Sequence, residues 1–239
     1  MIQLIGGGGF VNIKIQEQQL FKQWKKERCY DYFVKDGLFC EQEWNKQDIK
    51  ILYVLKEANY EESDVDLCEY LLSEVSAGYW KTWNNITRWT LAIRFGGEYP
   101  KHISKSDKTK CLKTIAMLNI KKVGGDAIAD DEEIRQYGER DARFIERQIE
   151  LYQPDIIICC GRGNGKNADI LYNYVFTNTS DWQPPINGYN YFLSTLNSGK
   201  KIPVISYRHP QIRGGHKEFE KYYNDMLELS GELKKRKLI

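Results

Sequence analysis

The feature that most constrains the fold is the apolar run Ile51–Leu55, which has polar residues on both sides. Five consecutive apolar residues, β-branched and aromatic ones among them, are typical of a strand buried on both faces of a parallel sheet. Glu57 and Asn59 follow this run directly. Because open α/β sheets bind ligands at the carboxyl ends of their strands, these two residues are the first candidates for chemistry. The alternative is that Glu57 only ends a strand and faces water.

The pattern of an apolar run followed by polar residues recurs along the chain. Further strands are predicted at residues 114–120, 156–160, 189–195 and 202–207. Helices are predicted at residues 16–32, 67–75, 79–95, 130–152, 167–175 and from about 216 onward, and residues 96–110 are predicted to form a loop. Strands that alternate with helices predict a single α/β domain over residues 11–239 with a mainly parallel sheet. The four glycines at residues 6–9 predict a flexible tail over residues 1–10.

Composition narrows the class of protein further. The net formal charge of +2 neither demands nor excludes nucleic acid as a partner, since a local basic face is sufficient. The six cysteines form no CxxC pair and the three histidines lack metal-ligand spacing, so we expect buried free thiols, no metal and no cofactor. The start of the chain lacks the features of a signal peptide, and no apolar run reaches the length of a membrane span. We therefore expect a cytoplasmic monomer that does not enter a membrane.

Residues 161–166, GRGNGK, resemble a phosphate-binding loop but do not fit its pattern. That pattern requires a glycine five positions before the Gly-Lys pair and a Ser or Thr after it, whereas Asn167 follows here. The loop still lies between a predicted strand and a predicted helix, where backbone N–H groups can hold a phosphate. A Rossmann-like nucleotide-binding protein is therefore retained as an alternative.

Four polar features follow the predicted parallel strands: Glu57, Asn119, the Gly161 loop and His209. A carboxylate, an amide and a histidine that converge at one sheet edge indicate a functional site. The segments also resemble, in order, motifs of the uracil-DNA glycosylase superfamily. KEANY at residues 56–60 resembles the GEAPG form of its first motif, MLN at 117–119 its LLLN segment, 155–161 its PDIIxxxG strand, and RHPQ at 208–211 its HPS motif. Asp36-Gly37, LKEAN at residues 55–59 and NIKKVGG at residues 119–125 also resemble a bacterial subgroup described as uracil-DNA-glycosylase-like.

The resemblance implies a three-layer α/β/α sandwich on a four-stranded, mainly parallel sheet. It implies a monofunctional DNA N-glycosylase in which Glu57 stabilises the sugar cation, Asn59 is an alternative residue for orienting the water, and His209 donates to the leaving base. Asn119 would read the base edge. Tyr60, Tyr79 and Trp80 would wall the pocket or stack on the extruded base, with plain core packing as the alternative.

Basic residues near the strand ends are candidates for phosphate contacts, although such side chains are usually solvated surface. They are Lys121, Lys122, Arg162, Lys166, Arg208 and Arg213. Ile212 and Arg213 precede two glycines and are expected to enter the duplex as a wedge, filling the gap left by a flipped base.

Departures from the family motif leave the substrate open. Asn59 replaces the usual proline, Lys56 the usual glycine, and Ala58 stands where a catalytic Asp or Asn is common. The four spaced cysteines of the iron–sulfur members are absent. The expected partner is duplex or single-stranded DNA that carries uracil, another deaminated base or a 5-modified cytosine, in repair or in defence against phage. A DNA-binding member of the superfamily without catalysis is the remaining alternative.

Overall fold

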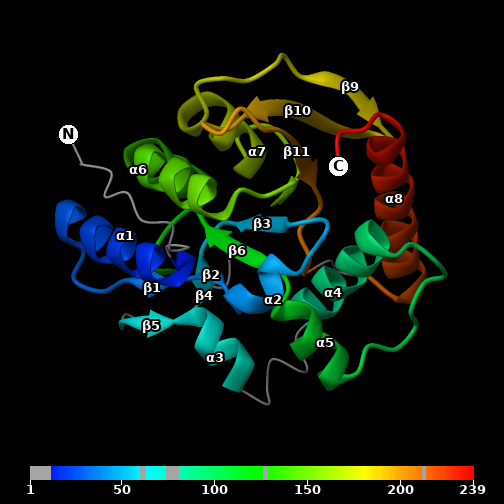
Figure 1. The fold of residues 1–239 in the computed structure, drawn as a ribbon, viewed down its shortest axis with the longest axis horizontal. Coiled ribbons are helices and arrows are strands. Elements are labelled where there is room, and N and C mark those ends of the chain that lie inside the picture. Colours follow the sequence, from blue (N-terminus) through cyan, green and yellow to red (C-terminus); the bar gives the residue numbers. More distant parts are fainter. Residues whose placement is uncertain (1–11, 60–62, 74–80, 126–128, 212–213) are drawn as a thin grey trace.

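The computed structural model describes residues 12–59, 63–73, 81–125, 129–211 and 214–239. A seven-stranded sheet with the order β2-β6-β3-β8-β11-β10-β9 forms its centre (Figure 1). In chain order, the strands are β2 (Gly37–Leu38), β3 (Ile51–Leu55), β6 (Ala116–Asn119), β8 (Ile156–Cys160), β9 (Gln183–Ile186), β10 (Tyr189–Thr195) and β11 (Lys201–Tyr207). The predicted α/β class with a mostly parallel sheet is therefore confirmed.

The sheet is wider than the four strands predicted. Its four central strands, β6, β3, β8 and β11, are parallel neighbours, while β2, β10 and β9 add antiparallel edges. Two of these edge strands carry little signal in the sequence. β2 has two residues, and β9 contains Pro184 and Pro185, which are tolerated only at a sheet edge because proline cannot donate to the ladder.

Burial on both faces of the sheet explains the continuous apolar runs. Ile51 and Tyr53 point into one hydrophobic cluster, and Leu52 and Val54 point into the other. All five residues of β3 and all five of β8 are buried. Since successive side chains of a strand point to opposite faces, a strand covered on both sides must be apolar throughout.

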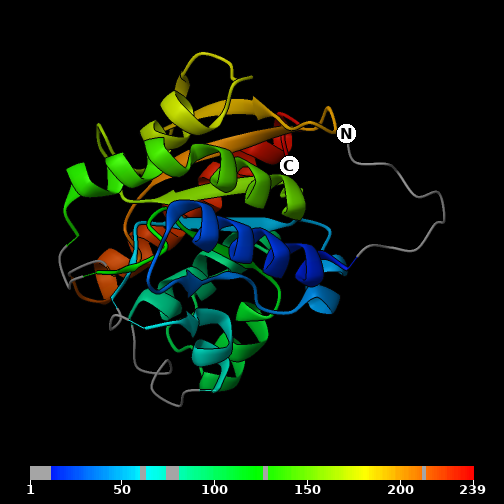
Figure 2. The same cartoon turned by 90° about the vertical axis from the view of Figure 1, so that its left-hand side faces the viewer.

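Helices cover both faces of the sheet (Figures 1 and 2). On the side of Leu52 and Val54 lie α1 (Ile13–Arg28), α2 (Glu41–Asn45), α6 (Asp131–Tyr152), α7 (Asn167–Ile170) and the π-helical η2 (Leu171–Val175). On the side of Tyr53 lie α3 (Leu67–Ser73), α4 (Lys81–Arg94), α5 (Lys105–Leu112) and α8 (His216–Lys235). In the described part of the chain, no helix combines the length and the apolar composition that a membrane span requires.

Capping residues explain two differences from the predicted helices: one helix was not predicted, and another ends earlier than predicted. Residues 96–110 were predicted to be a loop, but α5 begins there: the Ser104 hydroxyl accepts from the Asp107 backbone N–H at 3.1 Å, and the Asp107 carboxylate accepts in return. Helix α1 begins after Asn12, whose side chain accepts from Ile15 N. It ends at Arg28, earlier than predicted, since Cys29 has a left-handed backbone with φ of 53°.

Two small parallel ladders fasten the loops near the carboxyl end of the sheet. β4 (Ala58–Asn59) pairs with β7 (Gly124–Gly125), which joins the loop after β3 to the loop after β6. β1 (Val34–Lys35) pairs with β5 (Val65–Asp66). The first ladder holds the segment that carries Glu57 against the segment that carries Lys121.

Candidate functional site

The four predicted polar segments lie at one edge of the sheet. Asn119 ends β6, Glu57 follows β3, the Gly161 loop follows β8, and His209 follows β11. These strands are adjacent and parallel, so their carboxyl ends coincide. Backbone hydrogen bonds continue beyond the strands, from Lys121 N to Lys56 O at 2.9 Å and from Gly161 N to Tyr207 O at 3.0 Å. The edge is therefore a continuous rim that presents all four segments.

The Glu57 carboxylate is buried and lies beside an ammonium group. Its Oε2 is 2.9 Å from Lys121 Nζ, and only 4% of the Glu57 side chain is exposed. Lys121 Nζ also lies 2.9 Å from Glu133 Oε2 at the start of α6. Burial opposes the charge of Lys121, but the two carboxylates outweigh it and raise the pKa of this ammonium. Although Glu57 Oε2 is within ion-pair distance, it receives no aligned hydrogen bond within the described structure.

A glycine leaves the room that the Glu57 carboxylate occupies. A Cβ atom added to Gly125 would lie 2.0 Å from Glu57 Cδ and Oε2. We expect Gly125→Ala to displace this carboxylate from Lys121 while the unfolding free energy changes by no more than about 1 kcal/mol, since the clash is with the end of a flexible side chain.

Chemical denaturation measures the free energy of unfolding of Gly125→Ala. The displacement of the carboxylate is detected as a loss of any activity that depends on Glu57. Gly231→Ala is the matched control, because a Cβ there meets no atom within 4 Å. A Gly125→Ala protein with unchanged activity would show that the carboxylate position is not critical.

A second ion cluster joins the Gly161 loop to α6. The Asp131 carboxylate accepts from Lys56 Nζ at 2.5 Å and also pairs with Lys166. Burial lowers the pKa of both lysines, and Lys56 further lowers that of Lys166. Across both clusters, three lysines face three carboxylates, so the ion pairs at this edge are balanced in charge.

His209 is held in a form that can donate a hydrogen bond. Its Nδ1 accepts from Gln211 N at 3.2 Å, so the neutral imidazole carries its proton on Nε2. Although the residue is exposed, the atoms around the ring desolvate it and lower its pKa, and the positive charge of Lys56 lowers it further. The lowered pKa favours the neutral ring, which can donate from Nε2.

The pKa of His209 is therefore expected to rise in Lys56→Met, because the variant removes the positive charge that disfavours the imidazolium. NMR titration of the imidazole measures the midpoint, and a His209→Gln variant assigns the signal among the three histidines. Lys166→Met, which removes the other ammonium from Asp131, is the control and should change the midpoint less. A wild-type midpoint at 6.5 or above would contradict this account.

Buried amide groups at the same edge have unpaired polar atoms. Asn119 is 1% exposed, and its Nδ2 has no hydrogen-bond partner within the described structure. Asn167, which the sequence reasoning missed, is fully buried; its Nδ2 donates to Val54 O at 3.2 Å and to Cys160 O at 2.8 Å, and its Oδ1 is unpaired. Because buried polar groups normally have partners, such atoms indicate places where a ligand can bind. Only its position after the glycine loop could have indicated Asn167.

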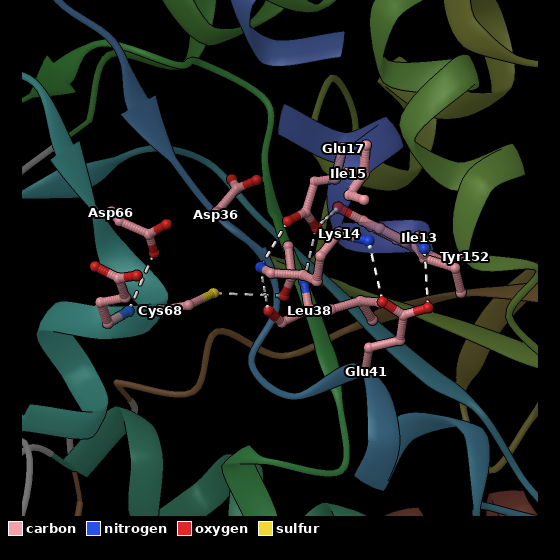
Figure 3. A network of polar contacts seen from close by, with 12 residues as sticks. Ile13, Lys14, Ile15, Glu17, Asp36, Leu38, Glu41, Asp66, Cys68 and Tyr152 are labelled. Atoms are coloured by element: carbon pink, nitrogen blue, oxygen red, sulfur yellow. Dashed lines mark hydrogen bonds and ion pairs between the residues drawn. The ribbon is translucent and has the colours of Figure 1, made fainter. Parts of the chain in front are cut away.

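A buried polar network supports Asn119 from below. Asp36 accepts from Asn119 N at 2.6 Å, from Lys122 Nζ at 2.7 Å and from Gln148 Nε2 at 2.8 Å. Gln148 Nε2 also donates to Tyr152 Oη at 2.8 Å, and Tyr152 donates to Glu17 at 2.7 Å; Figure 3 shows Glu17, Tyr152 and Asp36 in this region. Burial raises the pKa of the Glu17 carboxyl.

The prediction that Lys122 contacts DNA is wrong. Its side chain is completely buried in an ion pair with Asp36, and its ammonium lies over Trp24 at 5.1 Å. Lys121 is also unavailable to a phosphate, since only 7% of its side chain is exposed and two carboxylates hold it. Both lysines stabilise the edge instead of extending its basic surface.

The other predicted phosphate contacts lie on the surface or close to it. Arg162 is exposed and lies over the Tyr189 ring at 5.3 Å. Arg208 donates to Tyr189 Oη at 3.1 Å and covers the Tyr222 ring at 4.3 Å. Lys166 keeps a quarter of its side chain exposed. These three cations flank the carboxyl ends of β8 and β11, where a phosphate contact stays a prediction.

Several remaining predicted residues lie outside the described structure. Tyr60, Tyr79, Trp80, Ile212 and Arg213 belong to this group. Asn59 is exposed and pairs through β4 with Gly125.

The glycine loop itself does not favour nucleotide binding. Gly165 N–H is taken up by Asp169 Oδ2 at 2.6 Å, and α7 has only four residues. The backbone N–H of Gly165 is therefore bonded within the chain. In a phosphate-binding loop, such an N–H would point to the ligand.

Comparison with known proteins yields no relative for this chain. No protein-family model, no curated protein and no solved structure matches it. The edge of the sheet and its residues are therefore the basis on which the function is argued.

Proposed function

We propose that this chain is a DNA glycosylase that extrudes a pyrimidine-type base and hydrolyses its N-glycosidic bond. The observation that carries the proposal is one sheet edge with three complementary groups. They are the carboxylate of Glu57, the imidazole of His209, whose Nδ1 accepts from Gln211 N, and the amide of Asn119, whose Nδ2 has no partner among the described residues. The motifs resemble, in order, those of the uracil-DNA glycosylase superfamily, and with the assignment we propose the three-layer α/β/α sandwich that this resemblance implies.

Each group matches a charge that develops in the reaction. As the bond between C1′ and the base nitrogen breaks, the sugar becomes positive and the base departs with the electron pair. The Glu57 carboxylate stabilises the sugar cation, and His209 Nε2–H donates to a carbonyl oxygen of the base. A water oxygen then bonds to C1′, and the proton that the water loses neutralises the departed base anion, so the products are an abasic sugar with a C1′ hydroxyl and the free base. Asn59 is the alternative residue for orienting this water.

Asn119 is proposed to read the extruded base. Its amide can donate and accept, so it can pair with the edge of uracil or of cytosine. Uracil or another deaminated base and a 5-modified cytosine, such as hydroxymethylated or glucosylated cytosine in phage DNA, are the two substrate classes. The first places the enzyme in base-excision repair, and the second in defence against phage.

A DNA-binding protein without catalysis is the second candidate. The observation that favours it is the burial of the Glu57 carboxylate against Lys121, which leaves only 4% of the side chain exposed. A carboxylate that serves only as a structural partner of Lys121 would give the same arrangement.

Base release from matched duplexes tests the proposal. One duplex carries uracil, another hydroxymethylated cytosine, and a third glucosylated cytosine; free base is measured by mass spectrometry and abasic sites by alkali cleavage. Release that Glu57→Gln abolishes would support the enzyme and identify its substrate class. DNA binding without release from any duplex would favour the second candidate.

A further inference from the structure

A pocket along α1 lies apart from the four strand ends. It encloses about 460 Å³, which is within the usual range for ligand sites. Its lining comes from α1, from β1 and the segment that leads into it, and from Asp64 before β5. The lining residues are Phe21, Lys22, Lys25, Lys26, Cys29, Tyr30, Phe33, Lys35 and Asp64, here called the α1 groove.

The α1 groove carries a strong excess of positive charge. Four lysines and one aspartate line it, which leaves three positive charges, more than the +2 of the whole chain. Lys25 pairs with Asp64 at 2.8 Å. Lys22, Lys26 and Lys35 form no ion pair with any described acid, and Lys22 and Lys26 are exposed. Lys22, Lys25 and Lys26 are three and four positions apart, so the helix presents them together.

Stacked aromatic rings connect the α1 groove with the Glu57 edge. Tyr30 lines the groove and stacks on Tyr137, with ring centroids 6.1 Å apart. Lys121, the ion-pair partner of Glu57, has its ammonium 5.4 Å from the Tyr137 ring. Arg140 covers both rings from outside, at 5.0 Å and 4.3 Å. Tyr137 and Arg140 thus lie between the edge and the groove, while Lys121 itself is held in its ion pairs.

We propose that the α1 groove binds the phosphodiester backbone of a single nucleic-acid strand that extends from the Glu57 edge. The inference rests on the proposed function for the identity of the ligand. Its reason is electrostatic: the lysines of the Glu57 edge are held in balanced ion pairs, whereas Lys22 and Lys26 are exposed, form no ion pair with any described acid and can meet a polyanionic strand.

Binding of a labelled oligodeoxyadenylate, which contains no pyrimidine base, tests the groove independently of base release. The variant is Lys22→Gln/Lys26→Gln, and the matched control is Lys201→Gln/Lys237→Gln, which removes two exposed lysines at the opposite end of the sheet. Fluorescence anisotropy across a salt series gives the affinity and its salt dependence. At about 100 mM salt, we expect the groove variant to bind about tenfold or more weakly and its salt slope to fall by about 1.4 units. The control should bind like the wild type.

Three results would overturn the inference. One is an equal loss in both double variants, and another is an unchanged salt slope in the groove variant. The third is that micromolar pyrophosphate displaces the strand from the wild type but not from the groove variant. That result would assign the groove to a free phosphate compound. Failure of the proposed function looks different: no base is released, yet strand binding still depends on Lys22 and Lys26.

Discussion

Lys122→Met is expected to lower the free energy of unfolding by about 3–5 kcal/mol, because it leaves the Asp36 charge buried without its counter-ion. Both residues are completely buried, with Nζ 2.7 Å from each carboxylate oxygen. Burial lowers the pKa of Lys122, and Asp36 opposes that shift. Methionine nearly matches the shape of the lysine stem, so the loss reports the missing charge more than a cavity.

Chemical denaturation followed by tryptophan fluorescence measures this effect. Lys201→Met, at an exposed position, is the control and should change stability by no more than about 0.5 kcal/mol. The double variant Asp36→Asn/Lys122→Met removes both charges and should recover much of the loss, since a charged group no longer lies unpaired. A loss below about 1 kcal/mol in Lys122→Met would mean that water reaches Asp36.

The strands that carry the candidate site were predictable from the sequence. β3, β8, β10 and β11 were expected within one residue of their observed bounds. Central parallel strands are apolar throughout, so their runs stand out without knowledge of their neighbours. Their shared direction then brings Glu57, Asn119 and His209 to one edge. The short edge strands β2 and β9 lack such runs, which is why the sheet was predicted too narrow.

The burial and the ion-pair partners of the lysines could not be predicted from the sequence. Lys121 and Lys122 follow a strand as many surface lysines do, and the acid that buries Lys122 lies 86 positions earlier. Asn167 escaped notice for a similar reason, since its partners are the backbone carbonyls of Val54 and Cys160. Contacts of this kind depend on the tertiary fold, which residue type and local spacing do not encode.

Glu57→Gln is expected to slow base release by about a hundredfold or more while DNA binding persists. Glutamine keeps the shape of the side chain and removes its negative charge, which is the property that stabilises a sugar cation. Lys121 keeps Glu133 as its partner, at 2.9 Å, so the edge retains one of its two carboxylate contacts. Single-turnover kinetics on the preferred duplex measures the rate, and anisotropy with the same duplex measures binding.

Glu133→Gln distinguishes two possible roles of the Glu57 charge, which are to stabilise the sugar cation and to hold Lys121 in place. It removes the second carboxylate from the same ammonium, but its side chain is 44% exposed at the start of α6 and is assigned no contact with the sugar. We expect its rate to fall by less than about tenfold, since only the position of Lys121 changes. Equal losses in both variants would mean that Glu57 acts through Lys121 and is a positioning residue. A nearly normal rate in Glu57→Gln would transfer the role to Asn59, whose amide oxygen would then have to orient the attacking water without a carboxylate to stabilise the cation.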